Sequence, residues 1–272
     1  METAAKVKTQ PKTQKVYRNY NGNWDDVEII DAPDMDVFVL TYDREFTLAG
    51  ELVFEMEFDQ KKNEIQKQLN TYDDKGKITK HELYNEGELV ETIVFEYDDK
   101  GNLFSEYREF EEGYPLKTLY SYDDEKRVVE KRVEDTDGEL EKRETFVYHE
   151  EWKDKVVKHQ IFDEEDSLTT EEENEFEIRN GEVRTKSQTV TDHMINMKRK
   201  TVFHDAKERD DNIAYVTYNE KEKVVELFKI IFDEKGREIE ERSESVNGSE
   251  NFEVYYTYDD DDRVIHQEHR QG

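Results

Sequence analysis

The side chains best suited to chemistry in this chain are its seven histidines and its 71 aspartates and glutamates. The histidines are scattered, and His266 and His269, the closest two, would lie on opposite faces of a strand. Residues 135–139, Asp-Thr-Asp-Gly-Glu, resemble part of a calcium-binding loop, but the later ligands and the closing glutamate of such a loop are missing. A turn that contains glycine is the better interpretation. The sequence therefore predicts neither a metal site nor a cofactor.

Nucleophilic catalysis finds little support in the residue types. The chain contains no cysteine, which removes thiolate chemistry and disulfides. It also lacks the glycine-flanked serine of hydrolases and the glycine-rich loop that holds phosphates. Carboxylates occur along the whole chain, so no pair of them can be assigned to general acid–base work. We expect a protein without catalytic activity.

The acidic residues form several clusters in a strongly negative chain, in which 40 Lys and Arg against 71 Asp and Glu give a formal charge of −31. Charge of this size costs stability through self-repulsion, and it speeds the binding of a basic partner. For one cluster alone, a solvated turn that keeps a many-stranded sheet soluble is the simpler interpretation. For all clusters together we predict a surface that binds a basic protein, whereas nucleic acid is excluded by repulsion. The residues assigned to this surface are Asp163, Glu164, Glu165, Asp166, Glu171, Glu172, Glu173, Asp210, Asp211, Asp259, Asp260, Asp261 and Asp262.

An aromatic residue followed by aspartate and a polar turn recurs along the chain and predicts its architecture. The clearest copies begin at Tyr72, Tyr97 and Phe232, and each has glycine four residues later. Segments of about eight residues between turns leave no room for helices and predict consecutive antiparallel hairpins. The residues that open the turns are 11 to 15 positions apart, at 58, 72, 84, 97, 110, 122, 133, 148, 162, 176, 190, 203, 218, 232, 246 and 258.

Alternation along the strands assigns side chains to the two faces of the sheet. Ile93, Phe95 and Tyr97 would share an aromatic face, and Glu96 would lie on the opposite face. We expect the aromatic face to be the only substantial core, so that removing the Glu96 side chain costs under about 0.5 kcal/mol. Sixteen turns exceed what an open twisted sheet of about 10 strands holds without curling. The sequence therefore predicts an all-β fold, a long antiparallel meander of tandem β-hairpins (about 16 strands) curled into a trough or a partly closed barrel or shell.

Three regions follow from the distribution of the turns. Residues 1–18 are expected to be a flexible basic tail, residues 19–57 a less regular cap with strands, and residues 58–272 the domain of tandem hairpin repeats. No apolar run approaches the roughly 18 residues of a membrane span, so no membrane insertion is expected. The bacterial periplasm, the cell envelope and the cytoplasm all stay open as locations, and the oligomeric state is not predicted.

The phrase Tyr-Asp-x-x-Gly-x-Leu followed by Tyr-x-Tyr-Asp, which occupies residues 97–123, resembles the YD repeats of the RHS family of bacterial toxins and surface proteins. The match is good over roughly residues 70–125 and 228–264 and degenerate between them. In that family the repeats wind into a hollow shell around a toxin domain, so the resemblance implies a curled sheet. We expect this chain to be too short for a closed shell and to carry no toxin domain after its last repeat.

Short hairpin-repeat proteins of this kind also resemble immunity or antitoxin partners. The leading hypothesis is therefore a noncatalytic bacterial immunity or antitoxin protein that binds and neutralises a basic toxin or effector. Two alternatives stay open: an exported cell-envelope or surface YD-repeat protein with a structural or adhesive role, and a phage-type nucleic-acid mimic that inhibits a defence enzyme. A toxin gene beside this one would favour the first hypothesis, and a signal sequence at an isolated locus would favour the envelope role.

Overall fold

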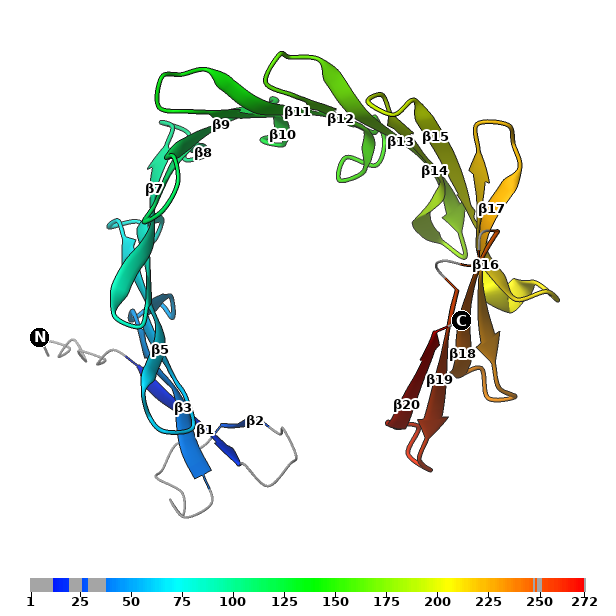
Figure 1. Cartoon of the computed structure of the whole chain (residues 1–272), viewed down its shortest axis with the longest axis horizontal. Coiled ribbons are helices and arrows are strands. Elements are labelled where there is room, and N and C mark those ends of the chain that lie inside the picture. The colour runs from blue at the N-terminus through cyan, green and yellow to red at the C-terminus, as the bar shows by residue number, and fades with distance from the viewer. Residues whose placement is uncertain (1–11, 20–25, 29–37, 247, 249–250, 272) are drawn as a thin grey trace, which may run out of the picture. The chain divides into compact units, whose positions relative to one another are not determined.

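β-strands make up nearly all of the regular structure (Figure 1). The computed structural model describes residues 12–19, 26–28, 38–246, 248 and 251–271. Within these residues the only helix is a single 3-10 turn, η1 (Ala206–Glu208). The chain divides into two compact units, residues 1–126 with 132–141, and residues 127–131 with 142–272. The expected all-β fold class is confirmed.

The first unit is an antiparallel meander. Strand β1 pairs with β2 and β3, and each strand from β3 to β9 then pairs with the next. The strands are β1 (Thr13–Asn19), β2 (Asp26–Glu28), β3 (Phe38–Phe46), β4 (Leu52–Phe58), β5 (Glu64–Tyr72), β6 (Ile78–Asn85), β7 (Glu88–Tyr97), β8 (Leu103–Phe110) and β9 (Leu116–Tyr122).

The second unit repeats this topology. The boundary between the units falls within β10 and β11, and each strand from β11 to β20 pairs antiparallel with the next. The strands are β10 (Val128–Glu134), β11 (Leu140–Tyr148), β12 (Val156–Phe162), β13 (Leu168–Arg179), β14 (Glu182–Asp192), β15 (Met197–Phe203), β16 (Ile213–Asn219), β17 (Val224–Phe232), β18 (Glu238–Ser245), β19 (Phe252–Tyr258) and β20 (Val264–Gln271).

The turn positions deduced from the sequence agree closely with the ends of the strands. Strands β5, β7 and β17 end at the marked residues Tyr72, Tyr97 and Phe232 themselves. The largest difference is at residue 176, because β13 continues to Arg179 before it turns. The predicted meander of tandem hairpins is confirmed, and the described residues form 20 strands instead of about 16, because strands β1 to β4 precede the first turn counted.

The N-terminal region differs from the expected tail over residues 1–18. Strand β1 pairs with β3 from Thr13 to Asn19, and Val16 and Tyr17 are only 7% and 8% exposed. One lysine of the expected tail takes part in this pairing, since Lys15 forms an ion pair with Asp43 at 3.3 Å. Residues 1–11, and the cap residues Trp24, Ile29 and Ile30, lie outside the described residues.

The aspartate that follows the strand-ending aromatic residue closes the turn. Asp73 Oδ1 accepts the backbone N–H groups of Lys75 and Lys77, both at 2.9 Å, and the hydrogen bond from Lys77 holds the pKa of Asp73 below its usual value. Gly76 adopts a φ of 80° in this turn, a conformation that costs glycine little. The same side-chain pattern recurs at Asp59, Asp135, Asp163, Asn219, Asp233 and Asp259.

The tyrosine before the turn aspartate links successive hairpins, in an arrangement that we name the tyrosine clamp. Its hydroxyl donates to the carbonyl oxygen of the first residue of the preceding strand, as in Tyr97 to Ile78 at 2.8 Å. In three clamps a Lys or Arg directly before that residue lies over the ring, 4.5 to 4.7 Å from its centroid: Lys77 on Tyr97, Arg127 on Tyr148 and Arg237 on Tyr258. The hydroxyl bonds run from Tyr72 to Leu52, Tyr97 to Ile78, Tyr122 to Leu103, Tyr148 to Val128 and Tyr258 to Glu238.

Neither face of the sheet forms a thick core. The buried hydrophobic residues among those described are Val16, Tyr17, Met56, Ile93, Ala206, Val216 and Val254. The clearest aromatic contacts lie in the second unit, where Tyr215 stacks on Phe228 at 5.0 Å and meets the edge of Phe203 at 6.1 Å. Strand pairing and the tyrosine clamps must therefore contribute much of the stability.

The face that was expected to be solvated is partly buried, which corrects the prediction for Glu96. Ser105 pairs with Glu96 across β7 and β8, so the two residues share the face opposite Ile93. Ser105 is 1% exposed, and its hydroxyl donates to Glu96 Oε2 at 2.5 Å. Removing the Glu96 carboxylate would leave a buried hydroxyl without its acceptor, so the loss is not negligible.

Candidate functional site

The thirteen acidic residues assigned to a binding surface all lie in the second unit, but in four separate places. Residues 163–166 form the turn between β12 and β13, and residues 171–173 lie inside β13. Asp210 and Asp211 follow η1, and residues 259–262 form the turn between β19 and β20. Successive turns of a meander alternate between the two ends of the strands. The β12–β13 turn therefore lies at the strand ends opposite those that carry the other two turns. The structure does not gather these residues into one site.

Two of the thirteen build their own turns. Asp163 Oδ1 accepts the backbone N–H groups of Glu165 and Ser167 at 3.0 and 2.9 Å. Asp259 Oδ1 does the same for Asp261 and Arg263, both at 2.9 Å, and the bond from Arg263 holds the pKa of Asp259 below its usual value. These two carboxylates already accept hydrogen bonds from the backbone of their own turns.

Others are ion-paired within the sheet. Asp211 receives two hydrogen bonds of 2.7 Å from Arg209, and this side-chain contact lowers the pKa of Asp211 to about 2. Asp166 lies 2.6 Å from Arg143, which belongs to the neighbouring strand β11. Asp262 lies 2.6 Å from Arg237 of the β17–β18 turn. Each pair joins the negative charge to a cation of the same unit, so its net field is small.

The glutamates of β13 are held by β12 and by their own strand. Glu171 accepts Lys158 Nζ at 2.9 Å and Gln160 Nε2 at 2.7 Å, and the lysine contact lowers the pKa of Glu171. Glu173 lies 3.7 Å from the same lysine. Glu172 accepts the Asn174 side-chain amide at 2.8 Å. The cluster at 171–173 is therefore a cross-strand network and not an open patch.

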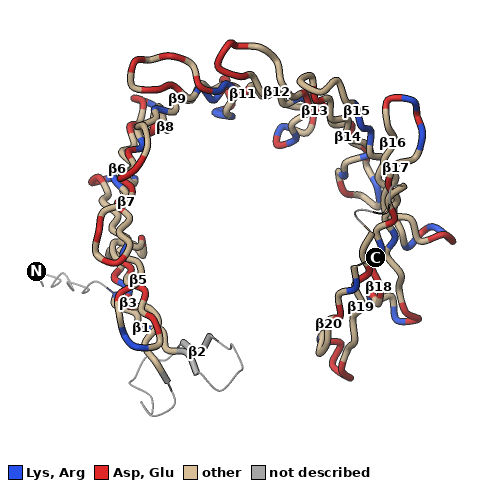
Figure 2. The backbone as a smooth tube through the Cα atoms, viewed as in Figure 1, with Lys and Arg blue, Asp and Glu red and all other residues tan. Residues whose placement is uncertain are grey.

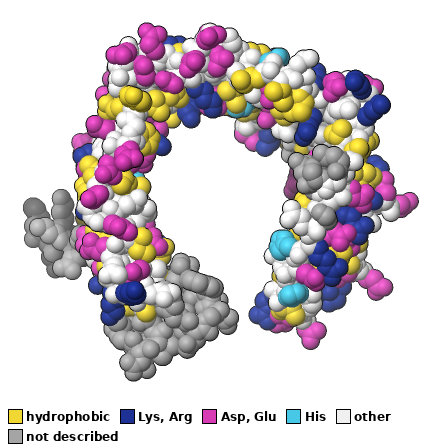
Figure 3. Space-filling view, viewed as in Figure 1, with side chains coloured by type: hydrophobic (Ala, Val, Ile, Leu, Met, Phe, Trp, Pro, Cys, Tyr) yellow, Lys and Arg dark blue, Asp and Glu magenta, His cyan; other side chains and the backbone are white. Residues whose placement is uncertain are grey.

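Within the described part of the chain, four of the assigned residues have neither an ion pair nor a side-chain hydrogen bond. They are Glu164, Glu165, Asp210 and Asp260, and all four are exposed. Figure 2 shows that Asp and Glu recur in the turns, with Lys and Arg between them. On the face seen in Figure 3, acidic, basic and hydrophobic side chains are interleaved. The negative charge open to a partner is thus concentrated at exposed turn tips.

A half-buried carboxylate of the second unit is surrounded by hydroxyl groups, two of which are buried. Glu226 accepts the hydroxyls of Tyr215 at 3.0 Å, Thr217 at 3.3 Å and Ser243 at 3.5 Å. Thr217 and Ser243 are 4% and 2% exposed, and a hydroxyl at that depth cannot attack a bound molecule. The Glu226 carboxylate accepts hydrogen bonds from polar groups that lie among aromatic side chains, since Ser243 pairs with both Phe228 and Phe252.

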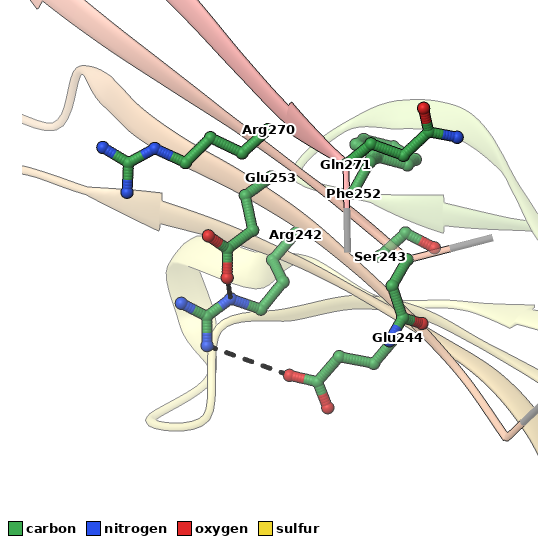
Figure 4. A pocket seen from close by; sticks show the side chains of 8 residues that line it. Arg242, Ser243, Glu244, Phe252, Glu253, Arg270 and Gln271 are labelled. Carbon is green, nitrogen blue, oxygen red and sulfur yellow. Dashed lines mark ion pairs between the residues drawn. The ribbon is translucent and has the colours of Figure 1, made fainter. Parts of the chain in front are cut away.

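A hollow of about 390 Å³ lies beside β18 to β20, lined by the residues labelled in Figure 4 together with Asn251. One of its lining residues is Arg242, whose Nη2 donates to Glu240 at 2.7 Å. Arg242 Nε lies 3.2 Å from Glu253, in ion-pair contact without hydrogen-bond geometry, and Nη1 lies 3.9 Å from Glu244. The guanidinium is surrounded by carboxylates of its own sheet, which leaves it little capacity for an anionic ligand.

A second hollow of about 600 Å³ lies between β15 and the β16–β17 turn. Lys198 and Lys200 line it on one side, and neither forms an ion pair in the described residues. Glu220 and Glu222 line the other side and oppose an anionic ligand. The mixed charge of this hollow favours no ligand class.

No metal centre emerges from the acidic and histidine residues. The described part of the chain contains no group of three or more such residues that could hold an ion. His81 bonds Asn70 at 2.8 Å, and its burial lowers its pKa. In the calcium-like segment, Asp135 accepts the N–H groups of Asp137 and Glu139, so the carboxylate closes a turn. Nor does any helix among the described residues have the length and apolarity needed to cross a membrane.

The tyrosine clamps are a structural feature that the sequence analysis does not predict. The repeated Tyr-Asp pair predicts a strand end and a turn, but it does not by itself predict the hydrogen bond of the hydroxyl group. A signal was present, because Lys77, Arg127 and Arg237 each stand five residues after a strand-ending aromatic residue and directly before the next strand. The recurrence of a cation at that position could have indicated a contact with the following ring.

Comparison with known proteins gives similarity at the level of the chain trace only. No family model matches the chain, and no curated protein matches it. Among solved structures, TcdB2-TccC3-TEV aligns with a TM-score of 0.42 and 12% identity, over 94% of this chain and 15% of that one. TcdB2-TccC3 aligns with a TM-score of 0.43 and 10% identity, over 90% of this chain and 16% of that one. A porin-like protein from Bacteroides uniformis aligns with a TM-score of 0.32 and 10% identity, over 94% of this chain and 91% of that one. The chain spans about one sixth of the length of the first two.

Proposed function

We propose that this protein is a noncatalytic binding protein that binds a basic protein, as an immunity or antitoxin protein binds and neutralises a toxin. The observation that carries the proposal is the formal charge of −31 together with exposed turn acids that have no cation of their own. Unpaired charge at the tips of turns costs self-repulsion, and long-range attraction of a positive partner offsets this cost.

The surroundings of the most buried hydroxyl groups support a binding role. The most buried hydroxyl groups, those of Ser105 and Ser243, bond to glutamates inside the sheet. The exposed turn acids lie in three separate turns: Glu164 and Glu165 between β12 and β13, Asp210 after η1, and Asp260 between β19 and β20. They are suited to attract a cationic surface and not to transfer protons to a bound substrate.

The test is association with a basic nuclease, measured by stopped-flow fluorescence at about 20 and about 300 mM salt, with inhibition of the nuclease as a second readout. We expect the association rate to fall at least about tenfold at the higher salt concentration, because screening removes steering. At the lower salt concentration, a variant with Glu164→Gln, Glu165→Gln, Asp210→Asn and Asp260→Asn should associate more slowly than the parent protein.

The matched control neutralises four exposed acids of the first unit, with Glu86→Gln, Glu88→Gln, Glu111→Gln and Glu112→Gln. Both variants lose the same charge, so a slower rate in the first variant alone locates the binding surface in the second unit. Equal slowing in both would assign the effect to net charge without a localised surface. An affinity and an association rate that do not change with salt concentration would contradict the proposal and favour the structural or adhesive role in the envelope.

A further inference from the structure

One of the tyrosine clamps is followed by a loop that a histidine closes. The residue directly after the clamp tyrosine is His149 in this case, whereas the other four clamps have Asp73, Asp98, Asp123 and Asp259. His149 begins the loop between β11 and β12, which covers residues 149–155. Its Nδ1 accepts the backbone N–H groups of Glu151 and Trp152, both at 3.1 Å. The imidazole therefore closes this loop as the Asp73 carboxylate closes its own turn.

The ring of His149 also belongs to a small aromatic cluster. It stacks on the indole of Trp152, with centroids 4.2 Å apart and planes at 20°. Phe176 of β13 meets both rings edge-on, at 6.3 Å from His149 and 6.5 Å from Trp152. Arg127, from the turn before β10, donates from Nη1 to the carbonyl oxygen of Lys153 at 2.8 Å. The loop is thus held by its own histidine, by Phe176 and by Arg127.

A second proton on the His149 ring conflicts with this arrangement. A neutral imidazole accepts at Nδ1 only when its proton is on Nε2, and an imidazolium carries an N–H group on both nitrogens. In the charged ring, Nδ1–H would point at the N–H groups of Glu151 and Trp152, which would lose their acceptor. An imidazolium is attracted to the face of an indole, but in the stacked position it still directs Nδ1 at these two donors. Stacking therefore does not remove the conflict.

The charged groups around His149 do not supply another partner for its ring. Among the described residues His149 forms no ion pair. Asp154 is paired with Lys155 at 2.6 Å, and the two glutamates beside Phe176 are paired with cations of β13 and β14. The charged groups of the elements packed on the ring are Glu150, Glu151, Lys153, Asp154 and Lys155 in the loop, Arg127 in the preceding turn, and Glu175 and Glu177 on β13.

We propose that residues 149–155 form a pH-sensitive loop, which is closed while His149 is neutral and opens when His149 takes up a proton. Opening separates Trp152 from Phe176, and it exposes two aromatic side chains that are half-buried in the closed loop. The pKa values of Asp73, Asp98 and Asp259 lie below the usual 3.8, so the turns that these carboxylates close stay closed in mild acid. The clamp turns thus differ in their response to pH, and the loop after Tyr148 responds first.

The experiment follows the full chain by proton–nitrogen NMR between about pH 8 and about pH 5, the range in which imidazoles titrate. We expect the amide signals of Glu151 and Trp152 to move along the same titration curve as the ring signals of His149. Acrylamide quenching of fluorescence is the second readout, measured in a Trp24→Phe background so that Trp152 is the remaining tryptophan. The quenching constant should rise at least about twofold from pH 8 to pH 5 as the loop opens.

His149→Asn separates titration from the fold of the loop. An asparagine oxygen accepts backbone N–H groups at any pH, as Asn219 does in its own turn, so the variant should show neither the amide shifts nor the rise in quenching. The matched control is His193→Asn, which replaces an exposed histidine of the β14–β15 turn and should leave both responses unchanged.

Two outcomes would overturn the proposal. One is that the amide signals of Glu151 and Trp152 stay fixed while the His149 ring titrates. The other is an equal rise in quenching in the parent protein and in His149→Asn. Neither measurement involves a binding partner, so the result is independent of the proposed function.

Discussion

The hydroxyl group of each clamp tyrosine joins one hairpin to the next, and its removal can be measured. Tyr97→Phe deletes the bond to the Ile78 carbonyl but keeps the ring under Lys77, so we expect a loss of about 1 kcal/mol. Tyr97→Ala also removes the half-buried ring and should cost about 2–3 kcal/mol. Urea unfolding followed by circular dichroism gives both values. The exposed Ser121, replaced by alanine, is the control and should change stability by under about 0.5 kcal/mol.

The Glu96–Ser105 pair yields a second prediction at this scale. Glu96→Ala should cost about 1–3 kcal/mol because it leaves the buried Ser105 hydroxyl without an acceptor. Glu96→Gln keeps an acceptor oxygen and should cost less. The double variant with Ser105→Ala should regain part of the loss, and a double-mutant cycle measures the coupling. Additive losses would show that the hydrogen bond contributes nothing to stability.

These residues also show what the sequence could and could not convey. The turn roles of Asp73 and Gly76 were predictable because they depend on neighbours within a few residues. The Ser105–Glu96 bond depends on the register of two strands, and that register shifts by one residue between Glu96 and Tyr97. A shift of this kind leaves no local mark, so the burial of Ser105 could not be deduced from alternation alone.

At the scale of the hairpin, the turn aspartates make the fold sensitive to acid. The pKa of Asp73 is below its ordinary value of 3.8 in the folded chain, mainly because of the hydrogen bond from Lys77. Its contribution to stability is therefore complete above pH 3.8 and is lost as the pH falls through the lower folded value.

Asp73→Asn should keep the turn and abolish this part of the acid dependence. Asn219 already closes a turn in the same way, accepting the N–H groups of Lys221 and Lys223 at 3.0 and 3.1 Å. We expect the thermal midpoints of the variant and the parent to converge as the pH falls below 3.8. A difference between them that stays constant with pH would mean that folding does not lower the pKa of Asp73.

Elements were predictable because the turn spacing is nearly constant, but the candidate surface was not. Alternation of turns between the two ends of the strands separates the residues at 163–166 from those at 259–262, although both clusters look alike in the sequence. Some of the cations that pair with them come from other strands, as Arg143 does for Asp166. Among the described residues, Glu164, Glu165, Asp210 and Asp260 are exposed and have neither an ion pair nor a side-chain hydrogen bond, whereas the other nine have at least one such partner.

At the scale of the whole molecule, excess negative charge should make stability depend on salt. Screening weakens the surface ion pairs, each worth under about 1 kcal/mol, but it also relieves repulsion among the charges that leave a net −31. Because acids outnumber cations 71 to 40, relief should prevail, and the thermal midpoint should rise between about 20 and 300 mM sodium chloride. A falling midpoint in calorimetry would show that the ion pairs dominate.

Pairing of each strand with its sequence neighbours, together with clamps that reach back one strand, gives the chain a mechanical character. A force that pulls the two ends of one unit apart acts across the strands, so the backbone bonds between two strands are loaded a few at a time. The outermost hairpin then separates from the sheet before the force acts on the next hairpin. Extension in an optical trap should proceed in steps of about 25 residues, the distance from Tyr72 to Tyr97, and each step should require the release of one tyrosine hydroxyl.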